Sequence, residues 1–174
     1  EMIIVDNASS KPEVLGFLGE VSGYPCARVL HLPVNRFYWP AINAGIGFAS
    51  PASEYVLALN DDIVIEGPSW LERLLDTFDG RSEVGYVGDF QPASFFPPLG
   101  GVTDGYCALF RRRLFDEVGL FDEKRPFYWG FVDFQLRAHR RGFTTRDIKK
   151  AGDTTDHISE VVTHLRGRTL EAIR

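Results

Sequence analysis

Apolar residues occur along the chain in short runs that alternate with longer segments in which they recur every three or four positions. The short β-branched runs are typical of buried strands, and the spaced pattern is typical of helices with one apolar face. Strands are therefore predicted at residues 2–5, 28–32, 55–59, 84–87 and 105–110. The strongly apolar run at 55–59 indicates a central position in a parallel sheet.

Helices are predicted between these strands. Ser10 with Glu13, and Ser69 with Glu72, have the spacing of a capping box, in which side chains bond the first turn of a helix. Helices are predicted at residues 11–20, 40–50, 112–118 and 131–141 and after Ser69. The apolar positions expected to be buried in the first of these are Val14, Leu15, Phe17 and Leu18. The proline-rich residues 91–101 are predicted to form a loop. This alternation predicts an α/β fold with a mostly parallel sheet flanked by helices.

Length and composition narrow the class of protein. The 174 residues suit one domain, and a net charge of −5 argues against a protein that binds nucleic acid by neutralising phosphates. Two cysteines are too few for a disulfide scaffold, which favours a reduced, cytoplasmic setting. No apolar stretch is long enough to span a membrane, so no membrane span is expected.

Two adjacent carboxylates follow the strand at 55–59, in the sequence Asn60-Asp61-Asp62. The carboxyl ends of strands in open α/β sheets are where ligands bind. Neighbouring carboxylates repel each other and favour a divalent cation, for which Mg²⁺ or Mn²⁺ is the expected choice. The alternative is a solvated acidic turn.

The order and spacing of several motifs resemble the family-2 glycosyltransferases of the GT-A (Rossmann-like) fold. Val5-Asp6-Asn7-Ala8-Ser9 resembles the family's Val-Asp-Asp/Asn-x-Ser, and Asn35 followed by Asn43-Ala44-Gly45 resembles Asn-x-Gly-Phe…Asn-x-Gly. Asn60-Asp61-Asp62 corresponds to the DxD-like cluster. In the second half, Gly105-Tyr106-Cys107 leads through Arg111-Arg112 to Val118-Gly119-Leu120-Phe121-Asp122-Glu123, similar to the family's acceptor-side segment.

The resemblance implies a role for each matching residue. Nucleotide-sugar binding is implied for Asp6, Asn35, Asn43 and Asp61. Acceptor binding is implied for Gly105, Tyr106 and Trp129, and metal binding for Asp62, Asp61 and His157, with His164 as the reserve. The alternatives are purely structural roles: Asp6 caps a helix, Asn43 forms a turn, the histidines lie at the surface and the aromatic rings serve packing. The implied organisation is a single domain over 1–174, with a nucleotide-binding half at 1–90, an acceptor-binding half at 91–150 and a tail at 151–174.

The late helix departs from the family pattern at its expected catalytic base. The family carries Glu-Asp-x-Asp there, whereas this chain has Gly130 and Phe131 in place of the acidic pair, followed by Asp133. Phe131 cannot accept a proton. Asp133 is the remaining candidate for the catalytic base, although it lies two positions further along the helix, about 200° around its axis. Its alternative role is an ion pair with Arg137.

The amino end also departs from the family, which normally has a strand and helix before Val-Asp-Asn-x-Ser. The chain is therefore expected to be an amino-terminally truncated GT-A-like domain. The missing strand would lie between those at 2–5 and 55–59. Those two strands then pair with each other, a second subunit forms a homodimer that covers the gap, or the chain is a fragment of a longer product.

Two hypotheses follow. In the first, the chain transfers a sugar from a nucleotide-diphosphate sugar to a hydroxyl of a glycan or lipid-linked acceptor, with a divalent metal and with inversion. The resemblance places this reaction in polysaccharide or glycolipid assembly, in the cytoplasm at the cytosolic face of a membrane. In the second, the chain is a truncated, non-catalytic glycosyltransferase-like domain that binds only a ligand or partner.

Overall fold

The computed structural model describes residues 1–65, 67–92, 101–125, 127–147 and 162–164. The chain folds as two compact units. The first unit comprises Glu1–Ser53 and Leu120–Phe134, and the second comprises Glu54–Gly119 and Gln135–Arg174. The single-domain division predicted from the sequence stays a prediction.

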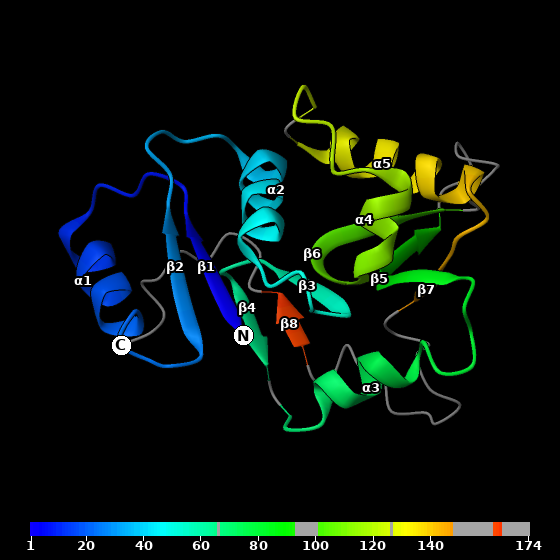
Figure 1. The fold of residues 1–174 in the computed structure, drawn as a ribbon, viewed down its shortest axis with the longest axis horizontal. Coiled ribbons are helices and arrows are strands. Elements are labelled where there is room, and N and C mark those ends of the chain that lie inside the picture. Colours follow the sequence, from blue (N-terminus) through cyan, green and yellow to red (C-terminus); the bar gives the residue numbers. More distant parts are fainter. Residues whose placement is uncertain (66, 93–100, 126, 148–161, 165–174) are drawn as a thin grey trace. The chain divides into compact units, whose positions relative to one another are not determined.

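The first unit is built on two parallel strands. Strand β1 (Met2–Asp6) leads through α1 (Pro12–Val21) to β2 (Ala27–His31), in register from Met2↔Ala27 to Asp6↔His31. Helix α1 packs against β2, and α2 (Tyr38–Phe48) packs against β1 (Figure 1). This strand–helix–strand arrangement confirms the predicted opening of an α/β fold.

The second unit is built on a four-stranded sheet with the order β3-β6-β5-β7. Its strands are β3 (Tyr55–Leu59), β5 (Val84–Pro92), β6 (Gly101–Arg111) and β7 (Thr144–Asp147). Strand β6 runs antiparallel to both β3 and β5, and β7 runs parallel to β5, so three of the four strands share one direction. A separate antiparallel pair joins β4 (Ile63–Ile65) to β8 (Val162–His164).

Three helices complete the described elements: α3 (Trp70–Asp76), α4 (Arg112–Val118) and α5 (Tyr128–Arg140). The boundary between the two units falls within α5. Gly119 and Gly142 follow α4 and α5 with φ angles of 85° and 86°, the left-handed conformation that glycine adopts without strain. The helices predicted at 112–118 and 131–141 end directly before these two glycines. The core of the second unit is formed by Leu74, Phe78, Val84, Val87, Cys107 and Leu109.

Several local predictions are wrong. Neither capping box forms, because the N-caps of α1 (Lys11) and α3 (Ser69) make no side-chain cap hydrogen bond. At α1 the start is set by a proline in the first turn, where the missing N–H needs no partner. Leu15 and Phe17 are 43% and 57% exposed, since a sheet of two strands receives only the narrow stripe of Leu18 and Val21.

Strand β3 lies at the edge of its sheet rather than at the predicted centre. The apolar run predicts buried side chains, which is correct only in part. It carries no information about which strand pairs with β3 or in which direction. The predicted loop also begins later than residue 91, because Gln91 and Pro92 extend β5 and pair with Val102 and Gly101. The overall α/β class is confirmed.

Candidate functional site

Asp6 ends β1 beside His31, which ends β2, because the parallel register pairs these two residues. The Asp6 Oδ2 atom accepts a hydrogen bond of 2.9 Å from His31 Nδ1, and Oδ1 accepts one of 2.9 Å from the Ser9 N–H. Burial acts to raise the pKa of the Asp6 carboxyl, but the hydrogen bonds from His31 and Ser9 outweigh it and hold that pKa below its ordinary value. Asp6 therefore remains a carboxylate well below neutral pH.

Asn7 and Asn35 shape the loop that follows β2. The Asn7 Oδ1 atom accepts a 2.8 Å hydrogen bond from the Arg36 N–H, and its Nδ2 donates to the Phe37 carbonyl at 3.0 Å. The Asn35 Oδ1 atom accepts from the Phe37 N–H at 2.9 Å. These bonds hold Phe37 at φ 66°, ψ −170°, a conformation that is costly for any residue except glycine. Phe37 stands where the family string Asn-x-Gly-Phe has its glycine.

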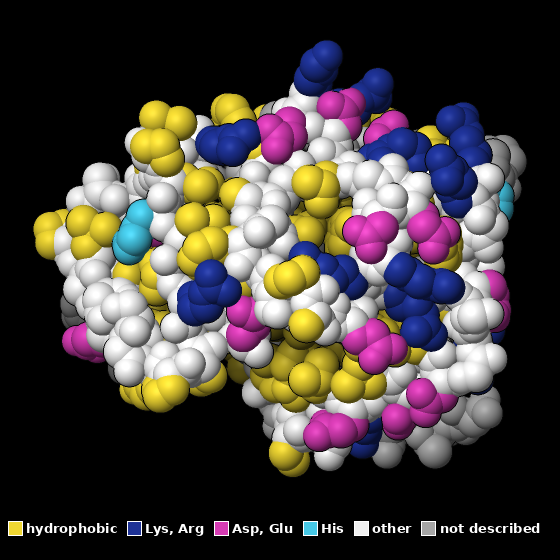
Figure 2. Space-filling model, viewed as in Figure 1, with side chains coloured by type: hydrophobic (Ala, Val, Ile, Leu, Met, Phe, Trp, Pro, Cys, Tyr) yellow, Lys and Arg dark blue, Asp and Glu magenta, His cyan; other side chains and the backbone are white. Residues whose placement is uncertain are grey.

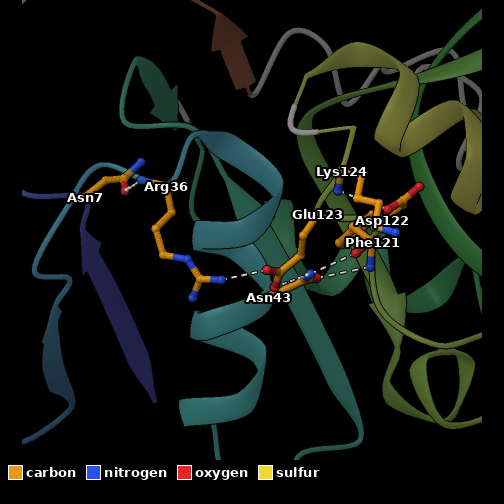
Figure 3. Close-up of polar contacts among 7 residues, drawn as sticks. All are labelled: Asn7, Arg36, Asn43, Phe121, Asp122, Glu123 and Lys124. Atoms are coloured by element: carbon orange, nitrogen blue, oxygen red, sulfur yellow. Dashed lines mark hydrogen bonds and ion pairs between the residues drawn. The ribbon is translucent and has the colours of Figure 1, made fainter.

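Asn43 holds the segment 121–123 through its buried amide. Its Nδ2 donates to the Phe121 carbonyl at 2.9 Å and to Glu123 Oε1 at 3.3 Å, while its Oδ1 accepts from the Phe121 N–H at 3.1 Å. Glu123 also forms an ion pair of 2.6 Å with Arg36 (Figure 3). The family resemblance implies that Asn43 lies beside the donor, and in the structure its amide forms hydrogen bonds with the protein's own backbone.

The expected position of the catalytic base is occupied by aromatic packing. Phe131 is buried and lies 5.0 Å, between ring centroids, from Trp39, which in turn stacks on Phe121 at 4.3 Å. A Cβ added at Gly130 would meet the Arg125 carbonyl oxygen at 2.3 Å and Trp39 Cδ1 at 2.6 Å. No side chain, acidic or otherwise, fits at Gly130 without a shift of the backbone.

Asp133 is half-buried on α5 and is the only acidic residue of that helix. Arg137, the ion-pair partner in the alternative role of Asp133, lies in the second unit. There its Nη1 atom donates a hydrogen bond of 2.5 Å to the Val118 carbonyl. The role of Asp133 as a base stays a prediction.

Exposed aromatic rings gather in the first unit. Trp129 is 57% exposed, and Phe127 and Phe37 are 62% and 51% exposed with their ring centroids 5.1 Å apart in an edge-to-face contact. Trp39 Nε1 donates to the Phe127 carbonyl at 2.6 Å and so fixes the backbone that carries this ring. Figure 2 shows hydrophobic side chains at the surface among charged ones on the face that it draws. The Trp129 side chain is therefore more than half exposed to solvent.

In the second unit, Asp61 and Asp62 form the tight turn between β3 and β4. Asp61 is exposed and Asp62 is half-buried. The antiparallel pairing of β4 with β8 sets residue 164 opposite Ile63, the residue after Asp62. His157 lies outside the described residues. Within the part of the chain that the structure describes, no three His, Cys, Asp or Glu residues form a group that could hold a metal ion.

Gly105 and Tyr106 lie in β6, where its register with β5 shifts: Gly88 pairs with Ala108 and the next residue, Asp89, pairs with Asp104. The Tyr106 hydroxyl donates to Asp89 Oδ2 at 2.9 Å, and the Asp104 carboxylate accepts from the Gly105 N–H at 2.8 Å. Burial, followed by this contact with the Asp89 carboxylate, raises the pKa of the Tyr106 phenol. Tyr106 is therefore a neutral hydroxyl at physiological pH.

The sequence missed four polar residues that organise these segments: His31, Arg36, Asp89 and Glu123. The signal for His31 was present, because two predicted parallel strands that end at neighbouring positions bring their last residues together. Glu123 and Arg36 are far apart along the chain, and no local pattern predicts that they form an ion pair.

Comparison with known proteins gives a consistent answer. The model of the family described as "Glycosyl transferase family 2" matches residues 1–96. The chain is 26% identical over 179 residues to the O-antigen biosynthesis protein RfbC of Myxococcus xanthus, covering 82% of this chain and 14% of that protein. The chain thus spans about a seventh of that relative's length.

Solved structures share the fold. The mannosyltransferase PcManGT from Pyrobaculum calidifontis, in complex with GDP-Man and Mn²⁺, superposes with a TM-score of 0.65 at 18% identity over 84% of this chain and 45% of that chain. Glucosyl-3-phosphoglycerate synthase from Mycobacterium tuberculosis gives a TM-score of 0.63 at 17% identity over 99% of this chain and 63% of that chain. With the family model matching more than half of the residues, the chain belongs to glycosyl transferase family 2 and has the GT-A fold.

Proposed function

We propose that this chain transfers a sugar from a nucleotide-diphosphate sugar to a hydroxyl of a glycan or lipid-linked acceptor, with inversion and with a divalent metal. The observation that carries the proposal is the family match over residues 1–96, which includes Asp6, Asn35, Asn43 and the Asp61–Asp62 turn. PcManGT was solved with GDP-Man and Mn²⁺, which supports a nucleotide sugar and a divalent metal as ligands.

The residues of the Asp61–Asp62 turn fit a hard cation. Two adjacent carboxylates supply the oxygen ligands that Mg²⁺ and Mn²⁺ prefer. His157 is proposed as a third ligand, with His164 as the reserve. A bound cation supplies charge stabilisation for the departing nucleoside diphosphate.

The protein's own groups supply the remaining roles. Asp6, Asn35 and Asn43 are proposed for the nucleotide side, and Gly105, Tyr106 and Trp129 for the acceptor side. The Tyr106 hydroxyl already donates to Asp89, and its oxygen can accept a hydrogen bond from a sugar hydroxyl. The exposed Trp129 ring is suited to a sugar because an aromatic ring packs on a sugar face. Asp133 is the proposed general base that accepts the proton of the attacking hydroxyl.

Titration calorimetry tests the donor site. UDP, GDP and dTDP are each titrated into the chain with and without Mn²⁺, and metal-dependent binding of at least one is expected. Absence of binding by all three in the presence of Mn²⁺ contradicts the proposal.

A second candidate function has a specific observation in its favour. The packing of Gly130 and Phe131 against Trp39 and Arg125 excludes the family's acidic pair, as expected for a domain that binds a nucleotide sugar without turning it over. Release of free nucleoside diphosphate from a sugar nucleotide separates the two functions. Release that Asp133→Asn abolishes supports the transferase, and nucleotide binding without release supports the binding domain.

The cytoplasmic location and a homodimer stay predictions. Among the described residues, no helix is both long and apolar enough to cross a membrane.

A further inference from the structure

The Asp6 carboxylate is poorly placed to contact a ligand directly. Its side chain is only 4% exposed, and each of its oxygens already accepts a hydrogen bond from the protein, Oδ2 from His31 Nδ1 and Oδ1 from the Ser9 N–H. A nucleotide that approached Asp6 would have to displace one of these donors. The Asp6 carboxylate, which the sequence motif assigns to nucleotide binding, is therefore already hydrogen-bonded within the protein.

His31 presents the exposed polar group at the same place. Its side chain is 59% exposed, and it stands beside Asp6 where two parallel strands reach their carboxyl ends. Ligands of open α/β sheets bind at such ends. Because a carboxylate only accepts hydrogen bonds, the 2.9 Å contact requires that His31 Nδ1 carries a proton. In the neutral ring Nε2 is then an acceptor.

We propose that His31 Nε2 is the group that contacts the nucleotide of the donor, and that Asp6 is a positioning residue that fixes the orientation and tautomer of the His31 ring. This inference rests on the proposed function and refines it. A carboxylate that holds one imidazole nitrogen and leaves the other for a reacting or bound group is a recurrent arrangement in enzymes. The matching donors on a nucleotide are a ribose hydroxyl and a base N–H.

Two substitutions separate the two nitrogens of the ring. In His31→Asn, the amide nitrogen replaces Nδ1 and keeps the bond to Asp6, but nothing replaces Nε2. In His31→Gln, the amide reaches further and replaces Nε2. His139, an exposed histidine of α5, gives the matched control His139→Asn. Circular dichroism melting confirms that each variant is folded.

Calorimetry with Mn²⁺ and whichever of UDP and GDP binds the wild-type chain gives the affinities. We expect His31→Asn to weaken nucleotide binding about tenfold, the loss of one hydrogen bond. His31→Gln is expected to recover part of this loss, and His139→Asn to bind as the wild type does. Equal affinity of His31→Asn and wild type overturns the inference and leaves the proposed function standing. If neither nucleotide binds the wild-type chain, the proposed function and this inference both fall.

The 2′-deoxy and 3′-deoxy analogues of the same nucleotide identify its donor group. If the penalty of His31→Asn disappears with either analogue, His31 contacts the ribose; if it persists with both, His31 contacts the base.

Imidazole ¹⁵N spectra test the role of Asp6. The wild-type ring is expected to be protonated at Nδ1, with the Nε2 resonance shifting when nucleotide is added. In Asp6→Asn, we expect both tautomers and weaker binding. A wild-type ring protonated at Nε2, or an Nε2 resonance that nucleotide does not shift, overturns the inference.

Discussion

At the scale of single residues, the backbone conformation of Phe37 costs free energy that burial of its ring does not offset. Its φ of 66° and ψ of −170° lie in a region that is essentially reserved for glycine, which costs a larger residue about 1–3 kcal/mol. The ring is 51% exposed, so little hydrophobic free energy is gained in return. The backbone is held there by Asn7 and Asn35, whose side chains bond the Phe37 carbonyl and N–H.

The strain predicts an unusual order of stability for two substitutions at this position. Phe37→Ala removes the ring and keeps the strained backbone, whereas Phe37→Gly removes both. After the greater chain entropy of glycine is subtracted, we expect Phe37→Gly to unfold with a free energy about 1 kcal/mol higher than Phe37→Ala. Urea unfolding measures both. An alanine variant as stable as the glycine variant contradicts the strain.

Asp6 makes a prediction about acid stability. Hydrogen bonds to the ionised carboxylate predict that Asp6→Asn lowers the free energy of unfolding by about 2 kcal/mol at pH 7. The folded pKa lies below the ordinary value of about 3.9, so this stabilisation is present above the unfolded pKa and is lost as the pH falls through the folded pKa. The wild-type advantage should stay constant to about pH 5 and shrink below about pH 4. His31 is the titratable group that faces Asp6, so the urea unfolding of the chain with and without Asp6→Asn is repeated in the His31→Asn background. A wild-type advantage that grows as the pH falls would contradict the assignment of the lowered pKa to Asp6.

At the scale of elements, the amide of Asn43 is the link between α2 and the segment after α4. Asn43→Ala would leave the buried N–H and carbonyl of Phe121 without the partners they now have. We expect a loss of about 3 kcal/mol in the free energy of unfolding. Asn35→Ala, which removes one exposed hydrogen bond, is the control and should cost less than about 1 kcal/mol. Similar losses in the two variants would show that the Asn43 amide is not needed to hold this segment.

The reactivity of the two cysteines tests how each of them is packed. Cys107 is fully buried in β6, and burial raises the pKa of its thiol to about 12, whereas Cys26 is exposed. Since the thiolate is the reactive form, Ellman's reagent at pH 8 should modify one thiol quickly in the folded chain and two in urea. Cys26→Ser should abolish the rapid reaction. Rapid modification of both native thiols would show that β6 is not packed as described.

The elements show what sequence patterns can and cannot predict here. Local periodicity found the strands at residues 2–5 and 55–59 and the helices that Gly119 and Gly142 follow, because each depends on neighbours in the chain. Strand pairing depends on distant segments, so β3 was wrongly expected at the centre of its sheet. The motif at Asp6 was visible in the sequence, but its hydrogen bond from His31 follows only from the register of β1 and β2.

At the scale of the whole molecule, the acids of the motifs are divided between the two units: Asp6 lies in the first, with Asn43, and Asp61 and Asp62 lie in the second, with Tyr106. A ligand that binds only the folded chain stabilises it by an amount that depends on the ratio of its concentration to its dissociation constant. The proposed nucleotide and metal ion are therefore expected to raise the free energy of unfolding.

This linkage predicts how ligands change the melting temperature. A nucleotide at a hundred times its dissociation constant stabilises the folded state by about 2.7 kcal/mol, which for a chain of this size raises the melting temperature by roughly 5–10 °C. With Mn²⁺ and UDP or GDP we expect such a rise, which removal of the metal with EDTA reverses. Asp62→Asn should lose most of the rise because it removes a carboxylate from the turn that would hold the metal. Asp79→Asn, at an exposed turn after α3, is the matched control and should keep the full rise. Equal rises in Asp62→Asn and Asp79→Asn would separate nucleotide binding from the Asp61–Asp62 turn.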